Sequence, residues 1–425
     1  MDIEQAFEGS LPANLNEACA AWTQVASRCT HCGSCQPRCE LLKDRTLDIG
    51  TIASKGQELF ATVNKATQAQ QGELDSAALK SGIRRFIAEE PSLYQALREC
   101  CFCNHCTATC PVGMVASQTT RPWRQLFALS GDMPEGDSKI VSVDKEWHIF
   151  SVYRAVYGIA YPEFYDLASL EPGQVDTLFF PGCALVSYMP ELVSAVGTWL
   201  NAQGFVWALS QSCCGSPLMS AGLIERSRSL RLKLLGQIRH GGIKQVITVC
   251  PGCDEELSEV FGDEVEFKPL SELLAQQHAT VAEQTGTFTL FDSCHDRTNT
   301  RHGRALRALL AENGCTIREM EHCGKNTLCC GAGGAVSAFA PELSARRVTR
   351  VLDEGKATTA DTLVSACPTC TYTLAQELLN KQWPFEQRNY LELVFGERVD
   401  WSAIFERLQA MWTGEYGEWV CQQLL

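Results

Sequence analysis

The sequence predicts an α+β multidomain protein, in which a helical N-terminal domain is followed by two pseudo-repeated α/β domains. Two dense cysteine runs flank a helical stretch, and strand-like and helix-like segments alternate further on. That second part repeats itself at a spacing of about 110 to 120 residues. The expected boundaries are 1–135 for the helical domain, 136–172 for an aromatic-rich connector, 173–286 and 287–398 for the two repeats, and 399–425 for a C-terminal tail.

Composition limits the functions that the chain can have. Its 425 residues carry a net charge of −14, which argues against nucleic-acid binding because no cationic surplus is present. No apolar run is long enough to span a membrane, and the acidic start lacks the pattern of a secretory signal. We therefore expect a cytoplasmic protein, or one that a partner holds at the inner face of a membrane.

The 23 cysteines are clustered in a long chain, whereas disulfide scaffolds are typically short and secreted. Metal ligation is the simpler explanation. Two runs follow the spacing C-x2-C-x2-C-x3-C, which is typical of bacterial two-cluster ferredoxins and differs from the paired spacing of zinc sites. Their members are Cys29, Cys32, Cys35 and Cys39 in the first run, and Cys100, Cys103, Cys106 and Cys110 in the second.

In such ferredoxins the fourth cysteine of each run binds the neighbouring cluster. The expected ligands of one [4Fe–4S] cube are Cys29, Cys32, Cys35 and Cys110, and those of the other are Cys100, Cys103, Cys106 and Cys39. Residues 56–99, between the runs, carry apolar residues at helical spacing. The two loops are therefore expected to be mounted on a small helical domain.

Each later repeat contains a strand-like run that ends in a cysteine, a helical stretch, a C-C-G motif, another helix, and a strand that ends in C-P-x-C. Strands alternating with helices predict a parallel sheet, and ligands of such sheets gather beyond the carboxyl ends of the strands. Cys183 and Cys250 in the first copy, and Cys294 and Cys367 in the second, follow strand-like runs. Each cysteine set should therefore converge at one sheet edge.

The two copies resemble the cysteine-rich CCG domain. From about residue 20 to 395, the chain is similar to the D-type subunit of heterodisulfide reductase and to the iron–sulfur subunits of anaerobic glycerol-3-phosphate dehydrogenase and glycolate oxidase. The resemblance implies two noncubane [4Fe–4S] clusters, each held by five thiolates. These are Cys183, Cys213, Cys214, Cys250 and Cys253, then Cys294, Cys329, Cys330, Cys367 and Cys370.

The resemblance further implies an iron–sulfur oxidoreductase subunit that passes electrons through the cubes to or from the CCG clusters, where a disulfide is reduced. Cys214, Cys330 and His295 are the catalytic candidates, with His295 either a proton donor or a structural residue. Gly215 and Gly331, together with Gly333 and Gly334, either let backbone N–H groups approach the cluster sulfurs or form tight turns.

Two other functions stay open. The chain could relay electrons from a flavin-dependent dehydrogenase of the 2-hydroxy acid or glycerol-3-phosphate type towards quinone, or it could be a zinc-binding assembly protein. No G-x-G-x-x-G motif follows a strand, so a flavin would belong to a partner subunit. The expected partners are a flavoprotein dehydrogenase or another electron-transfer subunit, and a membrane subunit or quinone.

The connector carries five aromatic residues at helical spacing, namely Trp147, Phe150, Tyr153, Tyr157 and Tyr161. Such a face either packs into a core between domains or forms a docking surface for a partner.

Overall fold

The computed structural model describes residues 11–37, 39, 42, 47–68, 76–115, 117–130 and 149–424. The chain divides into two compact units. The N-terminal unit comprises residues up to 138 together with 217–229 and 333–344, and the C-terminal unit comprises the rest. Two short segments of the repeats therefore group with the N-terminal unit, which the sequence boundaries do not foresee. None of the described helices is long and apolar enough to cross a membrane.

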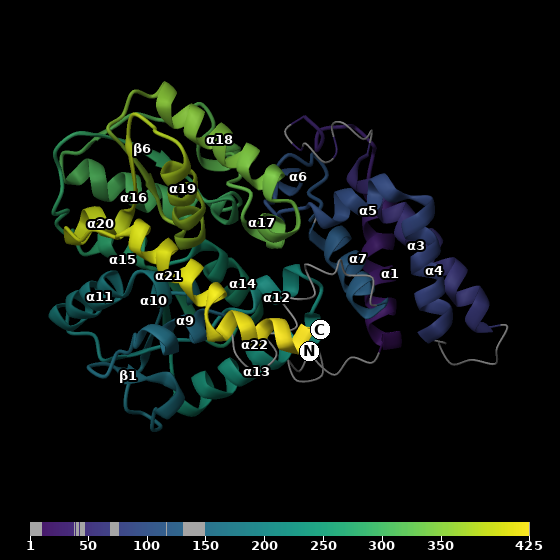
Figure 1. The fold of residues 1–425 in the computed structure, drawn as a ribbon, viewed down its shortest axis with the longest axis horizontal. Helices are drawn as coiled ribbons and strands as arrows, with labels where there is room; N and C mark the ends of the chain where they lie inside the picture. The colour runs from purple at the N-terminus through teal and green to yellow at the C-terminus, as the bar shows by residue number, and fades with distance from the viewer. Residues whose placement is uncertain are drawn as a thin grey trace. The chain divides into compact units, whose positions relative to one another are not determined.

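The N-terminal unit is built from helices, several of which lie side by side in Figure 1. They are α1 (Leu11–Arg28), α3 (Ile49–Gln68), α4 (Ser76–Glu89), α5 (Pro91–Arg98), α6 (His105–Ala108) and α7 (Ser117–Ser130). Trp22 and Trp123 are fully buried with ring centroids 5.0 Å apart, and Phe86 stacks on Trp123. Gly56 lets α3 approach Trp22, because a Cβ there would lie 2.2 Å from the indole ring. This aromatic core supports the two cysteine loops.

The C-terminal unit contains two parallel sheets with matching strand order. The first sheet has the order β1-β3-β2-β4-β5 and the second β7-β6-β8-β9, so the last four strands of the first correspond to all four of the second. The strands of the first sheet are β1 (Tyr165–Asp166), β2 (Thr177–Phe180), β3 (Trp207–Leu209), β4 (Gln245–Thr248) and β5 (Glu266–Pro269). Those of the second are β6 (Thr287–Phe291), β7 (Thr316–Ile317), β8 (Thr362–Ser365) and β9 (Glu386–Asn389).

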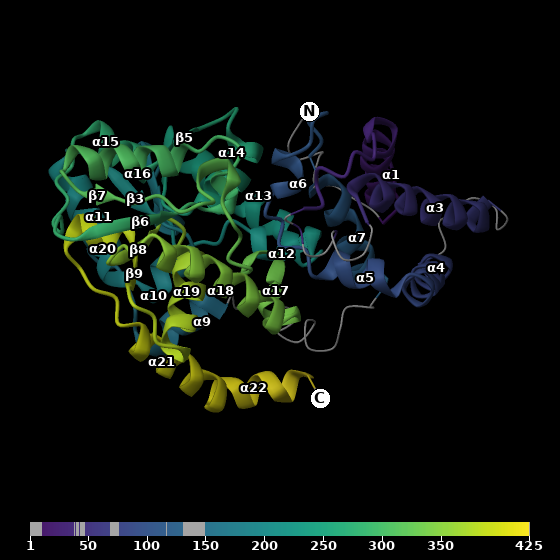
Figure 2. The ribbon, with the colours of Figure 1, turned by 90° about the horizontal axis from the view of Figure 1, so that it is seen from above.

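The strand order reverses at equivalent places in the two sheets. From β6 the chain passes to β7 on one side and then returns to β8 on the other, as it does from β2 to β3 and then β4. Right-handed crossovers then place the helices before and after the reversal on opposite faces of each sheet. Figure 2 shows the second sheet with α16 (Arg301–Glu312) and α19 (Pro368–Asn380) on its two sides. Such a reversal is where ligands bind in parallel sheets.

The first repeat also contains α10 (Cys183–Tyr188), α11 (Pro190–Ala202), α12 (Ser216–Ser220), α13 (Ile224–Gly241), α14 (Pro251–Phe261) and α15 (Leu270–Gln276). The second also contains a short 3-10 helix η3 (Cys294–Asp296), α17 (Val336–Phe339), α18 (Pro341–Ala357) and α20 (Tyr390–Phe395). Residues of both repeats contribute to one hydrophobic core, among them Leu192, Leu290 and Leu391. The repeats are thus packed together within the C-terminal unit.

The aromatic connector forms helix α9 (Ile149–Tyr157), and its aromatic residues turn inward. Tyr153 is 1% exposed and packs edge-on against Tyr188. Tyr161 is not on the helix, contrary to the prediction, because Gly158 with φ of +65° ends the helical path. Its hydroxyl nevertheless donates to Val186 O at 2.7 Å. These residues form core, and Trp147 lies outside the described residues.

The C-terminal segment that was expected to be a tail is helical. Helix α21 (Trp401–Thr413) buries Ile404, Leu408 and Met411 in the core of the C-terminal unit, and α22 (Glu415–Leu424) follows it (Figure 2). Asp400 caps α21 by accepting a hydrogen bond from Ala403 N. The segment therefore adds to the packing of this unit.

Glu392, in the capping box at the start of α20, predicts a pH dependence of stability. Its carboxylate accepts hydrogen bonds from Asn389 N and Val399 N, yet burial raises its pKa to about 7. Because the folded-state pKa exceeds the unfolded one, this group's stabilising contribution is present below about pH 4.5 and is lost as the pH rises through about 7, an effect on the order of 3 kcal/mol.

Anaerobic denaturant unfolding between pH 5.5 and 8 should therefore show stability falling with pH, with a smaller slope in Glu392→Gln. The absolute stability of that variant is not diagnostic, since a glutamine offers only one oxygen to the two backbone donors. An identical slope in both proteins would contradict the assignment.

Candidate metal centres

The first cysteine run lines a pocket of the N-terminal unit. Cys29, Cys32 and Cys35 border it, and so does Cys110 from the second run. Cys106 of the second run lines the same pocket, so the pocket does not by itself select Cys110 as the fourth ligand. The remaining wall is formed by the loop backbone and by apolar residues, among them Ile49, Val112 and Met114.

Cys106 of the second run has cysteines of both runs as neighbours. Desolvation of this partly buried thiol raises its pKa well above the ordinary value, and the Cys100, Cys39 and Cys35 thiols add to the increase. Cys39, the fourth cysteine of the first run, therefore lies near Cys106 of the second, and so does Cys35. The exchange of the fourth ligands stays a prediction.

The two loops share an unusual backbone conformation. The third position of each run, His31 or Phe102, has φ near +50°, and the fifth position, Gly33 or Asn104, has φ of +73° or +55°. Glycine and asparagine are the residues that tolerate this left-handed region best. Alternating backbone signs of this kind form a concave loop whose N–H groups can face an anionic centre. The two loops are thus structural duplicates.

His31 and Asp48 attach the first loop to α3. His31 Nδ1 lies 2.8 Å from Asp48 Oδ2, and Asp48 Oδ1 accepts from Thr51 N in the first turn of the helix. Burial alone would raise the pKa of Asp48, but the hydrogen bonds from Thr51 and His31 keep it below the ordinary value. Gly50 lets α3 approach the first loop, since a Cβ at this position would lie 2.6 Å from Cys29 Sγ.

The cysteines of the two repeats lie beyond the carboxyl ends of paired strands. Phe180 of β2 pairs with Thr248 of β4, and Cys183 and Cys250 follow three and two residues later. In the second repeat Phe291 of β6 pairs with Ser365 of β8, and Cys294 and Cys367 follow at the same intervals. Both pairs lie at the strand-order reversal, where the sequence predicted that ligands converge.

The five predicted thiols of the first repeat form a connected chain of neighbours. Cys213 lies next to Cys183 and Cys214. Cys214 also neighbours Cys253, which in turn neighbours Cys250. Only 29 residues separate Cys183 from Cys213, fewer than in the family pattern, yet Cys183 still lies within the set. The five thiols therefore form one group.

The second repeat brings three of its five predicted thiols together. Cys330 Sγ lies 3.2 Å from Cys370 Sγ, and Cys370 contacts Cys367. Cys294 is 5% exposed and enters from the end of β6, while Cys329 accepts a hydrogen bond from Gly331 N at 3.4 Å. Gly215 N donates to Cys213 Sγ at the same distance. Both glycines have φ near +80°, which a side chain would strain.

The two thiol sets meet. Cys250 of the first repeat lies within hydrogen-bonding reach of Cys367 of the second, and it packs against the hydrophobic cluster that contains Cys330, Cys367 and Cys370. Helix α14, which carries Cys253, contacts η3 of the other repeat, and α19, which carries Cys370, contacts α10. This reciprocal packing joins the sets at Cys250 and Cys367.

Many of the predicted ligand thiols thus lie close to one another, and clustered thiolates suit iron–sulfur clusters. The family models match the same regions. A 4Fe-4S dicluster domain matches residues 25–114, and a cysteine-rich domain, CCG, matches residues 177–258 and 288–375. The chain is a CCG-domain iron–sulfur protein.

The relatives of this CCG protein include components of named oxidoreductases. The D-type subunit of the dihydromethanophenazine:CoB–CoM heterodisulfide reductase of Methanosarcina barkeri is 24% identical over 82% of this chain and 88% of its own length. The B-type subunit of the fumarate reductase (CoM/CoB) of Methanothermobacter marburgensis is 26% identical over 84% and 69%. An iron–sulfur protein of Methanocaldococcus jannaschii is 24% identical over 68% of this chain, which spans only 59% of that relative.

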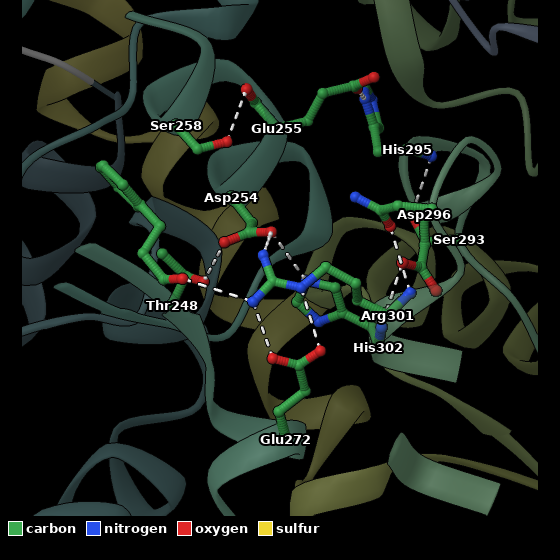
Figure 3. A network of polar contacts seen from close by, with 12 residues as sticks. Thr248, Asp254, Glu255, Ser258, Glu272, Ser293, His295, Asp296, Arg301 and His302 are labelled. Carbon is green, nitrogen blue, oxygen red and sulfur yellow. Dashed lines mark hydrogen bonds and ion pairs between the residues drawn. The ribbon is translucent and has the colours of Figure 1, made fainter. Parts of the chain in front are cut away.

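His295, the candidate proton donor, is held by a residue of the other CCG domain. Its Nδ1 lies 2.6 Å from Glu255 Oε2, and the two side chains meet at the upper edge of Figure 3. Burial alone would lower the pKa of His295, but this hydrogen bond and the charges of Glu255, Cys367 and Glu256 raise it to about 9. Gly252 leaves room for the imidazole ring of His295, because a Cβ at residue 252 would lie 3.3 Å from that ring.

A second polar network joins the two CCG domains below this pair (Figure 3). Asp254 accepts from Thr248 Oγ1 at 2.9 Å and faces Arg301, whose Nη2 lies 2.7 Å from Glu272 Oε2. Asp296 accepts from the backbone N–H groups of His302 and Gly303, and so satisfies the start of α16. These contacts fix the orientation of the segments that carry Cys253 and Cys294.

Sequence reasoning missed several residues at these sites. Glu255 and Glu256 directly follow the C-P-x-C motif, so their proximity to the ligands could have marked them. Arg231, which donates to Cys214 O at 2.9 Å and pairs with Glu256 at 2.7 Å, lies 17 residues from its partner cysteine on an ordinary helix. Gly333 and Gly334 have a packing role that the sequence did not indicate. They face the carbonyl oxygens of Cys101 and Cys100 in the N-terminal unit.

Proposed function

We propose that the chain is an electron-transfer subunit of a heterodisulfide-reductase-type oxidoreductase, in which two cubane [4Fe–4S] clusters supply electrons to two CCG sites that reduce a disulfide. The contact between Cys250 and Cys367 carries this proposal, because it joins two five-thiol sets in one unit. Reduction of a disulfide to two thiols consumes two electrons and two protons, and iron–sulfur clusters supply electrons singly. Two adjoining sites match that demand.

The proposed ligands are the crossed cubane sets and the two five-thiol sets described above. The family resemblance implies that the CCG clusters are noncubane, and this form is part of the proposal. Most CCG thiols are buried, which keeps water from the site, and Gly215 and Gly331 direct N–H groups at Cys213 and Cys329. Hydrogen bonds to ligand sulfurs raise the potential of such clusters.

The catalytic roles are assigned to this chain's own side chains. Cys214 and Cys330, the second cysteines of the two C-C-G motifs, are proposed to face the reacting sulfurs. His295 is proposed to direct a proton to a departing thiolate, since Glu255 fixes its ring and its charge is felt at Cys367. The equivalent positions in the other half are Ala184, which follows Cys183, and Tyr372, which stacks on Tyr188 with ring centroids 5.6 Å apart. The pair of His295 and Glu255 therefore has no counterpart at those positions.

The electrons must come from another chain, since no nucleotide-binding glycine motif is present. The named relatives are subunits, and we propose a flavoprotein or another electron-transfer subunit as the donor, with a membrane subunit or quinone as a further partner.

Iron content and a substrate-dependent signal test the proposal. Protein purified without oxygen should hold about 16 iron atoms per chain, four for each cluster. The CoM–CoB heterodisulfide named for the relatives, or glutathione disulfide, should induce a paramagnetic signal that Cys330→Ala abolishes. Cys315→Ala is the matched control, because Cys315 is a buried thiol of the same unit outside every ligand set.

A result of about eight iron atoms would leave the CCG domains empty and defeat the proposal. Full iron content without any disulfide-dependent signal, but with electron transfer from a flavoprotein to quinone, would instead establish the relay function.

A further inference from the structure

Arg124 is a buried side chain of α7 that lies outside every ligand motif, and only 3% of it is exposed. Its Nε donates to Leu97 O at 2.9 Å, its Nη1 to Ser220 O and Gly334 O, both at 2.7 Å, and its Nη2 to Arg98 O and Cys100 O. An arginine has five N–H donors, so each one has a backbone carbonyl as its acceptor. All of these residues belong to the N-terminal unit.

The acceptors come from three distant parts of the sequence. Residues 97–100 lead into the second cysteine run. Ser220 lies six residues after Cys214 of the first C-C-G motif, and Gly334 lies four residues after Cys330 of the second. One guanidinium thus bonds to a cubane ligand loop and to the continuation of both C-C-G motifs. Phe102 of the same loop lies against it, with the guanidinium carbon 4.8 Å from the ring centroid.

Glycines make this close approach possible. A Cβ on Gly222 would lie 2.3 Å from Arg124 O, and one on Gly334 would lie 2.2 Å from Cys100 O. Both glycines have positive φ, +84° and +66°, so an L side chain would also strain the backbone. Gly333 meets Cys101 O in the same way, at 2.4 Å. The three segments are therefore packed backbone against backbone around Arg124.

We propose that Arg124 is a positioning residue that couples the cluster-binding loop 100–106 to the segments that continue from both C-C-G motifs. When a cluster fixes this loop, the carbonyl bonds order residues 217–229 and 333–344 at the same time. The inference rests on the proposed cluster loading of this loop, but not on disulfide reduction.

Hydrogen–deuterium exchange on the cluster-loaded chain tests the coupling. Arg124→Lys keeps the positive charge but replaces the planar fork by a single ammonium group. Exchange in residues 97–103, 217–229 and 333–344 should rise together, by about tenfold or more, while β2 and β6 stay protected. Arg121→Lys is the matched control, since Arg121 also lies over Phe102 and the five carbonyl bonds remain. A response confined to residues 97–103 would overturn the proposal.

One-sided variants give an independent reading if Arg124→Lys fails to fold. Gly334→Ala should raise exchange in residues 333–344 but not in 217–229. Gly222→Ala should raise exchange in residues 217–229 but not in 333–344. If neither segment loosens, the packing around Arg124 does not hold them.

Loss of a loop ligand completes the test. Cys103→Ala should loosen both segments in the otherwise unchanged protein and add nothing in Arg124→Lys, as expected of two changes that act through one network. Iron loss from this run with both segments still protected would refute the coupling. The measurement needs no disulfide, so its outcome is independent of whether the protein reduces one.

Discussion

Replacing Cys110 by alanine is expected to abolish the cluster signal of the first cysteine run, although Cys110 lies on the second. Cys110 borders the same pocket as Cys29, Cys32 and Cys35. Cys106 also lines this pocket, but the predicted exchange of fourth ligands assigns it, with its neighbours Cys100 and Cys39, to the other cube. The signals of the two cubes can be separated by the potential at which each appears in an anaerobic redox titration followed by paramagnetic resonance. Cys110→Ala and Cys29→Ala should remove the same signal, and Cys103→Ala and Cys39→Ala the other.

Double variants sharpen this test. Cys29→Ala with Cys110→Ala should affect one cube only, whereas Cys103→Ala with Cys110→Ala should affect both. Cys101→Ala is the control, because Cys101 is buried beside Cys100 but out of phase with the ligand spacing. If Cys110→Ala and Cys103→Ala remove one and the same signal, each run binds its own cluster, and the exchange of fourth ligands is absent.

The sequence was sufficient for those features that depend on local spacing. A C-x2-C-x2-C-x3-C run holds its thiols within one loop, and a strand that ends two or three residues before a cysteine places that cysteine at the sheet edge. The strands around Phe180 and Ser365 and the fold of each repeat could therefore be predicted from the residues themselves. The duplication then predicted that the second sheet would copy the first, as the strand orders show.

Features that depend on long-range packing could not be predicted. The contact of Cys250 with Cys367 arises from the docking of two repeats, and nothing in either motif specifies that surface. Arg124 bonds to backbone carbonyls, which every residue supplies, so no side-chain pattern marks its partners. The close approach of Gly334 to Cys100 O could not be predicted for a related reason. A glycine near a double cysteine leaves room for a cluster or for another backbone, and only the fold shows which backbone lies against it.

Removal of Arg231 is expected to cause the largest loss of stability. Arg231 and Glu256 are each 3% exposed at the side chain, and their Nη2 and Oε2 atoms lie 2.7 Å apart. Arg231→Leu takes away the counter-charge and leaves the Glu256 carboxylate buried, which typically costs about 3–5 kcal/mol. It also removes the donor to Cys214 O, so the first CCG site should lose part of its iron. Anaerobic denaturant unfolding and iron analysis measure the two effects.

Arg239 provides a matched control on the same helix. It forms two hydrogen bonds of 2.8 Å with Glu264, but 45% of its side chain is exposed, so Arg239→Leu should cost less than about 1 kcal/mol. The double variant Arg231→Leu with Glu256→Leu removes both charges, and it should recover much of the stability without restoring the bond to Cys214 O. Stability would then return while the iron deficit persists. The stability loss arises from the unpaired buried charge of Glu256, whereas the iron loss arises from the missing hydrogen bond to Cys214 O. If Arg231→Leu and Arg239→Leu lower the free energy of unfolding equally, the buried ion pair contributes no more than the surface pair.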